Sequence, residues 1–352
     1  MYLRPVQFVD TPVGRDGEVA RLAGGMCWFA AYEVIEGGAR RTLSVAEFEV
    51  GLGRDDARAA LLHARITAPR APLVLGERTL RLDQPHVMGI LNVTPDSFSD
   101  GGNLHNNPVA AAEAGFDMGI AGASLIDVGG ESTRPGAKDV WEGDEIKRVV
   151  PVIEQLSASG TPVSIDTRKA AVMEAAIAAG ALVLNDVSAL LWDDRALGVA
   201  VRTRLPVVLM HSPDPAKGPH TGPGYGNVLT EVFDWLEARL DAVEAAGVDR
   251  SRIIVDPGIG FGKSLADNLA LLNGLAMFHG LGCPLLLGAS RKRMIGALSG
   301  EAPVDERLGG SITLAIHGAA MGAQLLRVHD VAETVQAVRV WRGLRDAALV
   351  GR

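Results

Sequence analysis

The most regular feature of the chain is a series of short apolar runs that repeats from residue 87 onward. Each run is rich in Val, Ile and Leu, ends at a polar or glycine residue, and is followed by a helix-like, often alanine-rich segment. Continuous rather than alternating hydrophobicity predicts strands that are buried on both faces, as in parallel sheets. Eight such runs occur, at residues 87–91, 124–128, 162–165, 181–184, 206–210, 252–255, 284–287 and 324–328.

Strict alternation of eight strands and helices favours an α/β fold, the (β/α)8 TIM barrel, over residues 83–352. In that fold the active site lies at the C-terminal ends of the strands, so the polar residues that end the runs are the first candidates for chemistry. An open, doubly wound sheet also produces alternating strands and helices, and it is the structural alternative.

Residues 1–82 follow a different pattern and predict a small appended α/β module. Residues 28–50 predict two strands around the pair Gly37-Gly38, and residues 55–66 predict a short helix. We place the boundary to the barrel within residues 80–86. No motif indicates what this module does.

Composition narrows the class of protein. Of the 352 residues, 47% are hydrophobic and 22% are charged, as in soluble globular proteins. The net charge of -8 and the lack of basic clusters argue against a nucleic-acid partner. No stretch approaches the ~18 apolar residues of a membrane span, and the N-terminus lacks a signal-peptide pattern. Cys27 and Cys283 are expected to be buried, reduced thiols. We therefore expect a cytoplasmic protein without a membrane partner.

Two long polar loops follow the first two runs. Residues 92–102, NVTPDSFSDGG, and residues 129–137, GGESTRPGA, are too rich in Gly, Pro and Ser to be helical. Both exceed the usual length of about 2–6 residues for such connections. Long polar loops at this end of a barrel are usually functional. We interpret them as two flaps that screen a reactive intermediate from water.

Three later runs end in Asp166, Asn185 and Asp256. A lone residue of this kind is more often the N-cap of the next helix, but convergence at one barrel mouth favours a shared binding site. The string GKS at residues 262–264 is similar to the end of a nucleotide-binding P-loop. Pro257 stands where the first glycine of that motif belongs, so we reject a nucleotide site.

The last two runs add an anion-binding pattern. Ser290 stands where the next helix is expected to begin, so its hydroxyl and free backbone N–H groups would suit a small anion; a simple N-cap is the alternative. Arg327 and His329 lie two positions apart and share a face of the eighth strand. Because barrels often bind phosphate near strands 7 and 8, this pair predicts a phosphate clamp.

Taken together, these strings resemble the dihydropteroate synthases, a family of pterin-binding TIM barrels. The resemblance covers residues 87 to about 340, through NVTPDSFSDGG, ESTRPGA, SIDTRK, LNDVSAL, LMH, DPGIGFGK, GASRKRMIG and RVHDV in the family's order. It implies a transferase of folate biosynthesis that joins 6-hydroxymethyl-7,8-dihydropterin diphosphate to 4-aminobenzoate and is a target of sulfonamides. It also implies Mg²⁺ as cofactor and a homodimer.

The resemblance further implies a role for each candidate side chain. The pterin would be bound by Asp166, Asn185, Met210, Asp256, Phe261, Gly288 and Lys292. The diphosphate would be bound by Asn92, Thr133, Arg327 and His329, with Asn92 also reaching the metal. The aminobenzoate would be bound by Thr133, Arg134 and Ser290. The residues expected to act in catalysis are Asn92, Thr133, Arg134, Lys292, Arg327 and His329. His211 receives no role.

Two related functions are the alternatives. A pterin-dependent methyltransferase barrel would share the pterin residues, but it would need neither the two flaps nor the site at residues 290–292. A non-catalytic pterin-binding paralogue would be expected to have lost loop or clamp residues, yet Asn92 and Arg134 are intact. The chain departs from the family's pattern at Arg168, where a small residue is more common. The Pro/Gly-rich residues 212–226 predict no particular conformation.

Overall fold

The centre of the computed structural model, which describes residues 1–94, 107–133, 136–137, 139–218, 220, 222 and 224–350, is an eight-stranded parallel sheet. Its order is β12-β11-β10-β9-β8-β7-β14-β13, so neighbours in the chain are neighbours in the sheet. The strands are β7 (His86–Asn92), β8 (Leu125–Gly129), β9 (Val163–Asp166), β10 (Val183–Asp186), β11 (Val207–Met210), β12 (Ile253–Asp256), β13 (Leu286–Leu287) and β14 (Leu325–Val328). All eight predicted strands are confirmed.

The two end strands of this sheet meet and close a barrel. A parallel bridge joins Val255 of β12 to Leu285, next to β13, and the Val255 N–H donates to the Pro284 carbonyl at 2.9 Å. Closure confirms the predicted (β/α)8 barrel, and the open-sheet alternative is wrong.

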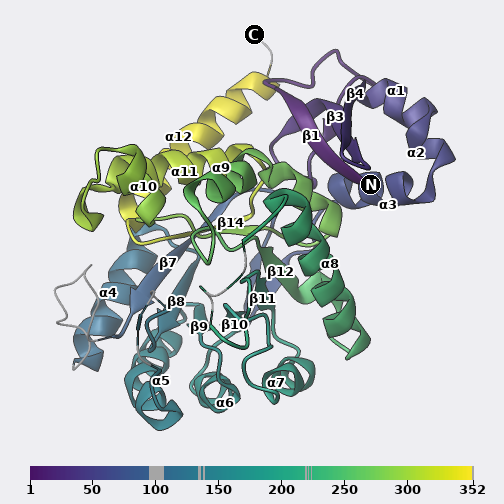
Figure 1. Ribbon diagram of the computed structural model, residues 1–352. Helices are drawn as coiled ribbons and strands as arrows, with labels where there is room; N and C mark the ends of the chain where they lie inside the picture. The colour runs from purple at the N-terminus through teal and green to yellow at the C-terminus, as the bar shows by residue number, and fades with distance from the viewer. Residues whose placement is uncertain are drawn as a thin grey trace.

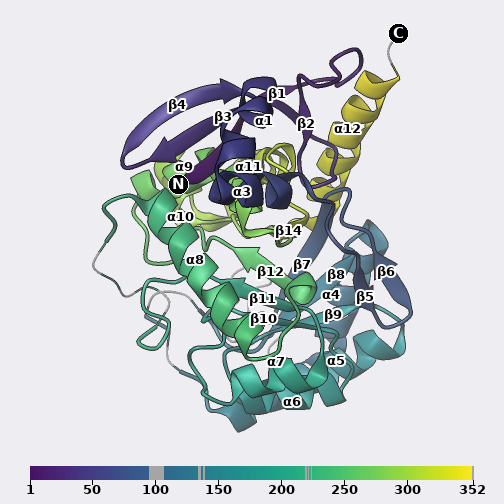
Figure 2. The same ribbon diagram turned by 90° about the vertical axis from the view of Figure 1, so that its right-hand side faces the viewer.

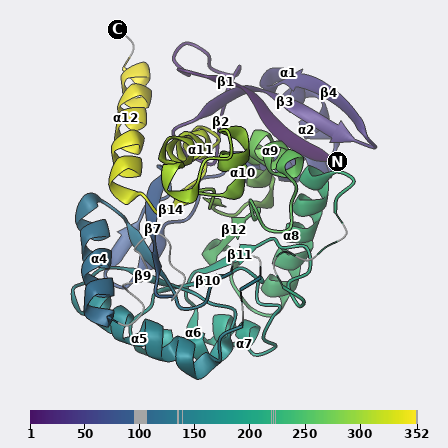
Figure 3. The ribbon, with the colours of Figure 1, turned by 60° about the vertical axis from the view of Figure 1, so that its left-hand side comes forward.

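Helices surround the barrel, and Figure 3 shows α4 to α8 following one another around it. Glycines in the left-handed conformation follow some of them, as Gly122 does after α4 (φ 112°). The helices are α4 (Pro108–Ala121), α5 (Glu142–Ala158), α6 (Ala170–Ala178), α7 (Ala196–Thr203), α8 (Val228–Ala245), α9 (Leu265–Asn273), α10 (Arg293–Leu298), α11 (Leu308–Ala320) and α12 (Val331–Leu349), with 3₁₀ turns η1 (Arg250–Arg252), η2 (Leu275–Leu281) and η3 (Val304–Glu306) (Figure 1). Among the described residues, none of these helices is both long and apolar enough to cross a membrane.

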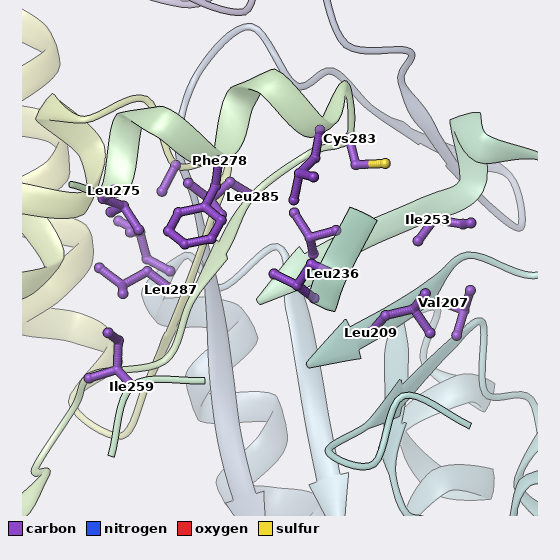
Figure 4. Packing of buried hydrophobic residues seen from close by; sticks show 14 of the residues in the cluster. Val207, Leu209, Leu236, Ile253, Ile259, Leu275, Phe278, Cys283, Leu285 and Leu287 are labelled. Carbon is purple, nitrogen blue, oxygen red and sulfur yellow. The ribbon is translucent and has the colours of Figure 1, made fainter. Parts of the chain in front are cut away.

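Side chains alternate along each strand between the helices and the barrel interior. Val207 and Leu209 of β11 belong to the main core between strands and helices, together with Leu236 of α8 and Phe278 of η2 (Figure 4). Each such buried side chain contributes about 1.5–3 kcal/mol to folding. The residue between them, Val208, belongs to a separate apolar cluster inside the barrel.

The N-terminal residues form an antiparallel sheet of their own, in the order β1-β3-β2 with β4 also paired to β3. Its strands are β1 (Tyr2–Val9), β2 (Ala20–Arg21), β3 (Trp28–Glu36) and β4 (Ala39–Ser44), followed by α1 (Val45–Val50), α2 (Leu52–Asp55) and α3 (Ala57–Thr67). The predicted hairpin around Gly37-Gly38 and the predicted helix are confirmed, but residues 45–50, predicted as the end of the second strand, form α1 instead. This sheet lies against the barrel's outer helices, where the Tyr2 hydroxyl donates to Asp234 of α8 at 2.7 Å.

A second hairpin, β5 (Leu73–Leu75) and β6 (Arg78–Leu80), lies apart from that sheet (Figure 2). Leu73, Leu75 and the nearby Leu82 are each 2% exposed. They pack against the apolar ring inside the barrel, which we define as Met88, Leu125, Val183, Val208, Ile254, Leu286 and Leu325. The hairpin therefore covers the N-terminal end of the barrel and leaves the C-terminal end for the site.

Candidate active site

Inward-facing polar residues form a layer directly above the apolar ring. On β8, β10, β12 and β14, a member of the ring is followed two positions later by a polar or charged residue. Because side chains two apart on a strand share a face, these residues point into the barrel at its C-terminal end. They are Asp127, Asn185, Asp256 and Arg327. Asn92 and Asp166, the last residues of β7 and β9, both lie in register with Gly129 of β8. We call this set the polar layer.

Arg327 ties two carboxylates of the polar layer together. Its Nε donates to Asp127 Oδ2 at 2.6 Å, and its Nη2 donates to Asp166 Oδ2 at 2.7 Å. Burial opposes the charge of Arg327, but the two carboxylates outweigh burial and raise its pKa. Burial also raises the pKa of Asp166 to about 7. The layer therefore holds charge that nearby groups compensate only in part.

Asp127 is a site residue that the sequence analysis missed. It is fully buried, and its Oδ2 also accepts from Asn185 Nδ2 at 3.0 Å. Its Oδ1 is buried without a hydrogen-bond partner among the described residues. A buried, unpaired carboxylate oxygen is costly in a folded protein unless a ligand or water satisfies it. The signal was available: Asp127 is a charged residue inside the second run, in the same penultimate position that Arg327 holds in the eighth.

Asp256 is the last residue of β12, and one of its carboxylate oxygens accepts a hydrogen bond from the backbone. Its Oδ1 accepts the Gly258 backbone N–H at 2.7 Å. Gly288 lacks a side chain beside the other oxygen, since a Cβ there would lie 3.7 Å from Asp256 Oδ2. Burial raises the pKa of Asp256 to about 6. The carboxylate thus has an acceptor that an adjacent glycine leaves uncovered.

Lys263 shapes the loop behind Asp256 rather than holding a nucleotide phosphate. Its Nζ donates to the carbonyls of Gly258 at 2.8 Å and Phe261 at 3.1 Å, and lies 3.0 Å from His211 Nδ1. Burial, with Lys292 nearby, lowers the pKa of Lys263 to about 7. Burial and the charge of Lys263 lower the pKa of His211 to about 2, so that histidine stays neutral.

An apolar wall stands beside the polar layer. Met210, Phe261 and Val187 form a small buried cluster. Lys292 Nζ lies 4.0 Å from the centroid of the Phe261 ring, a cation–π contact. His220, which the sequence analysis did not single out, stacks on the same ring at 5.2 Å and 12°. Its Nε2 also lies 2.8 Å from the Thr133 carbonyl, so it bridges two loops of the mouth.

Ser290 and His329 are direct neighbours. The Ser290 hydroxyl lies 3.0 Å from His329 Nδ1, and the His329 backbone N–H donates to the Ser290 Oγ at 3.2 Å. The expectation that a helix begins at Ser290 is wrong, because α10 begins at Arg293 with Lys292 as its N-cap. The N-cap alternative for Asp166, Asn185 and Asp256 is wrong as well, since α6, α7 and α9 have the N-caps Lys169, Arg195 and Ser264.

The structure describes only part of the two predicted flaps. Asn92 and Thr133 are described and lie at the mouth, whereas Arg134 and residues 95–106 lie outside the described residues. The Asn92 Oδ1 would lie 3.6 Å from a Cβ at Gly129, next to Asp166. The screening role of the flaps therefore stays a prediction.

The fold and the site define a class of protein, because residues 88–329 match the family model described as pterin binding enzyme. The dihydropteroate synthase of Escherichia coli strain K12 is 46% identical over 263 residues, which cover 74% of this chain and 92% of that one. That of Bacillus subtilis strain 168 is 44% identical over 256 residues, covering 72% and 86%.

Solved structures agree with these relatives. A Xanthomonas albilineans dihydropteroate synthase with 4-aminobenzoic acid matches with a TM-score of 0.73 and 49% identity, covering 78% of this chain and 98% of that one. The chain therefore belongs to the pterin-binding enzyme family, among the dihydropteroate synthases. The resemblance drawn from the sequence is confirmed. The N-terminal sheet lies outside the matched region of the family model.

Proposed function

We propose that this chain joins 6-hydroxymethyl-7,8-dihydropterin diphosphate to 4-aminobenzoate, giving 7,8-dihydropteroate and diphosphate. The observation that carries the proposal is the polar layer, which presents buried carboxylates to a mouth lined by Met210 and Phe261. Further support comes from relatives of 40% identity and above, one of them a Xanthomonas albilineans enzyme in complex with 7,8-dihydropteroate.

In this proposal the pterin lies across the polar layer. Its amino group and adjacent ring N–H form a donor pair that a carboxylate accepts in bidentate fashion, and Asp256 is assigned that role. Asn185, Asp166 and the unpaired Oδ1 of Asp127 would meet the remaining polar atoms of the ring. Met210 and Phe261 would contact its faces, with Lys292 above Phe261. Gly288 would leave room beside Asp256.

The diphosphate is assigned to Arg327, His329, Asn92 and Thr133. Arg327 uses Nε and Nη2 for contacts within the polar layer, and the guanidinium carries further N–H groups that would donate to the diphosphate. The contact with Ser290 fixes the imidazole of His329. These groups would stabilise the charge that develops on the diphosphate as the bond to the pterin methylene carbon breaks. The aminobenzoate nitrogen then attacks that carbon, in a pocket assigned to Thr133, Arg134 and Ser290.

Mg²⁺ is proposed as the cofactor. The described residues contain no cluster of three or more His, Cys, Asp or Glu side chains that would hold a metal. The carboxamide oxygen of Asn92 is a hard donor at the mouth and fits a Mg²⁺ ion that is held mainly by diphosphate oxygens and water. When bound, the ion would neutralise part of the charge of the leaving group.

The direct test is an assay of the purified chain with both substrates, with and without Mg²⁺. The expected result is dihydropteroate and diphosphate in equal amounts, with product formation lost when aminobenzoate or Mg²⁺ is omitted. Tight pterin binding without any product would favour the non-catalytic paralogue instead. Methyl transfer from a methylated tetrahydropterin to a corrinoid would favour the methyltransferase barrel.

Two further properties are proposed from weaker support. A homodimer is supported by the exposed Val340 and Leu344, four positions apart on α12 and 61% and 68% exposed, which a second copy would cover. Light scattering at micromolar concentration tests it. A cytoplasmic location is supported by Cys27 and Cys283, two buried free thiols, and cell fractionation tests it.

A further inference from the structure

The segment between β8 and α5 is joined at its two ends by one carboxylate. Glu131 Oε1 accepts the Val140 backbone N–H at 2.9 Å, although nine positions separate the two residues. The side chain of Glu131 is only 4% exposed. Thr133, which lies two positions after Glu131, is therefore carried on a segment whose ends are fixed to each other.

Arg168 and Lys169, which lie shortly after β9, donate hydrogen bonds to this carboxylate. Arg168 donates to Glu131 Oε2 through Nη2 at 2.8 Å and Nε at 3.2 Å, and Lys169 Nζ donates to Oε1 at 2.8 Å. Lys169 also binds Glu145 of α5 at 2.6 Å, and Glu145 is fully buried. The strand end that provides Asp166 is thereby connected to the base of the segment that provides Thr133.

Arg168 makes two more contacts that no lysine could reproduce in full. Its Nη2 lies 3.2 Å from Asp139 Oδ1, one residue before Val140, so the guanidinium bridges both ends of the segment. Its Cζ lies 4.0 Å from the centroid of the Trp192 ring, beyond β10. A planar guanidinium can stack on an aromatic ring and donate to two carboxylates at the same time, whereas an ammonium is a point charge. We define the staple as Glu131, Asp139, Val140, Arg168 and Trp192.

The ion pair between Arg168 and Glu131 is buried, so loss of either partner would leave the other charge poorly compensated. The side chain of Arg168 is 7% exposed, so water does not screen its pairing with Glu131 as it screens a surface pair. Burial alone would raise the pKa of Glu131, but hydrogen bonds from Lys169, Val140 and Arg168 outweigh it and lower that pKa. Loss of Arg168 would leave the acids Glu131, Asp139 and Glu145 around Lys169 alone.

We propose that Arg168 is a positioning residue that holds Glu131, Asp139 and Val140 together and so sets the affinity for the arylamine carboxylate that Thr133 helps to bind. The inference rests on the proposed function for the identity of that substrate. It goes beyond the proposed roles of the substrate-binding residues because Arg168 would act through Glu131 and Asp139 rather than by touching the substrate. It also gives a physical reason for an arginine at this position.

The kinetic test compares Arg168→Ser with Arg202→Ser. The control loses an equal charge from an exposed arginine, 63% exposed, that pairs with Glu174. We expect Arg168→Ser to raise the KM for aminobenzoate about tenfold, as loss of hydrogen bonds to a buried charge would. Its kcat and its KM for the pterin diphosphate should change by less than about twofold. A fall in kcat with both KM values unchanged would overturn the proposal.

Hydrogen exchange supplies a test that needs no activity. In Arg168→Ser, peptides that contain the Val140 amide should exchange about tenfold faster, while peptides from β9 and β12 keep their protection. Arg168→Lys should recover part of this protection through Glu131, but not the bridge to Asp139. Equal exchange in the wild type and Arg168→Ser would contradict the staple, even if the wild type made no dihydropteroate. Absence of product with the expected exchange would reject only the proposed function.

Discussion

Two layers of the barrel interior differ in chemistry, although their residues lie only two positions apart on the same strands. In the apolar ring, residues such as Leu125, Val183 and Ile254 pack against the hairpin that covers the barrel's N-terminal end. Two positions later, the polar layer carries Asp127, Asn185 and Asp256. One layer contributes to stability by burial, and the other places costly polar groups where a ligand can meet them.

The contrast explains how one fold meets two demands. The ring and its covering hairpin fix the strands, so the polar layer stands on a rigid base. The polar layer disfavours the charged form of its carboxyls, because burial raises the pKa values of Asp166 and Asp256 to about 7 and about 6. Changes in the apolar ring should therefore alter stability, and changes in the polar layer should alter binding and, where they break an ion pair, stability as well.

The largest expected effect is that of Asp256→Ala on pterin binding. Loss of a bidentate, charge-assisted contact should weaken affinity by about 4 kcal/mol, roughly a thousandfold. Calorimetric titration with a pterin measures it, and Asp241→Ala on the exposed face of α8 serves as the control. The melting temperature should not fall, because burial disfavours the charge of Asp256. Unchanged pterin affinity in the variant would refute the assignment of this carboxylate.

Next comes Leu75→Ala in the covering hairpin. Removal of a side chain that is 2% exposed should lower the free energy of unfolding by about 3 kcal/mol, with both KM values unchanged at 25 °C. Chemical denaturation gives the free energy. Val74→Ala, one position away and 65% exposed, is the matched control and should cost less than about 0.5 kcal/mol. If both variants lost equal stability, the hairpin would not cover the ring as described.

Arg327→Met tests how the ion pairs of the polar layer affect the pH dependence of stability. Arg327 lowers the pKa of Asp166, so its loss should raise that pKa further. When the pKa of a carboxyl is raised in the folded state, the folded protein loses stability as pH rises toward and through that pKa. The variant should therefore be destabilised by about 2 kcal/mol at pH 8, and by less at pH 5 where Asp166 is protonated. Denaturation at the two pH values measures the deficit; a larger deficit at pH 5 would contradict the ion-pair account.

The smallest effect is expected at His220, which contacts Phe261 and Thr133 from two different loops of the mouth. His220→Ala should raise the KM for each substrate about threefold, because it removes the stack on Phe261 and the bond to the Thr133 carbonyl. His220→Phe keeps the stack, so it should raise only the KM for aminobenzoate. Steady-state kinetics with each substrate varied separates the two variants. Identical effects of both would show that the stack contributes nothing to pterin binding.

The sequence predicted the barrel because parallel strands that are buried on both faces leave a local signal, a continuous apolar run. It also predicted Asp166, Asn185, Asp256 and Arg327, which stand at or near the ends of those runs. Asp127 escaped although it holds the same penultimate place in its run as Arg327. Arg327 was singled out because His329 follows it two positions later, whereas the residue two positions after Asp127 is a glycine, Gly129. The start of α10 was misplaced because Arg291 takes a left-handed conformation (φ 56°) that delays the helix.

Contacts between distant segments left no local signal. His220 lies in a Pro/Gly-rich stretch, and only the folded chain brings it to Phe261 and Thr133. Arg168 looked like a departure from the family's pattern until its partners Glu131 and Trp192 were in place. Pairing of β1 with β3 likewise depends on residues about thirty positions apart in places, such as Tyr2 and Ile35.

The most direct test of the polar layer as a pterin site is a crystal structure of the wild-type chain soaked with a dihydropterin. The account predicts the amino edge of the ring within hydrogen-bond distance of the Asp256 carboxylate, with Met210 and Phe261 against its faces. A ring bound elsewhere on the molecule, with the carboxylates of Asp127 and Asp256 contacted only by water, would contradict it.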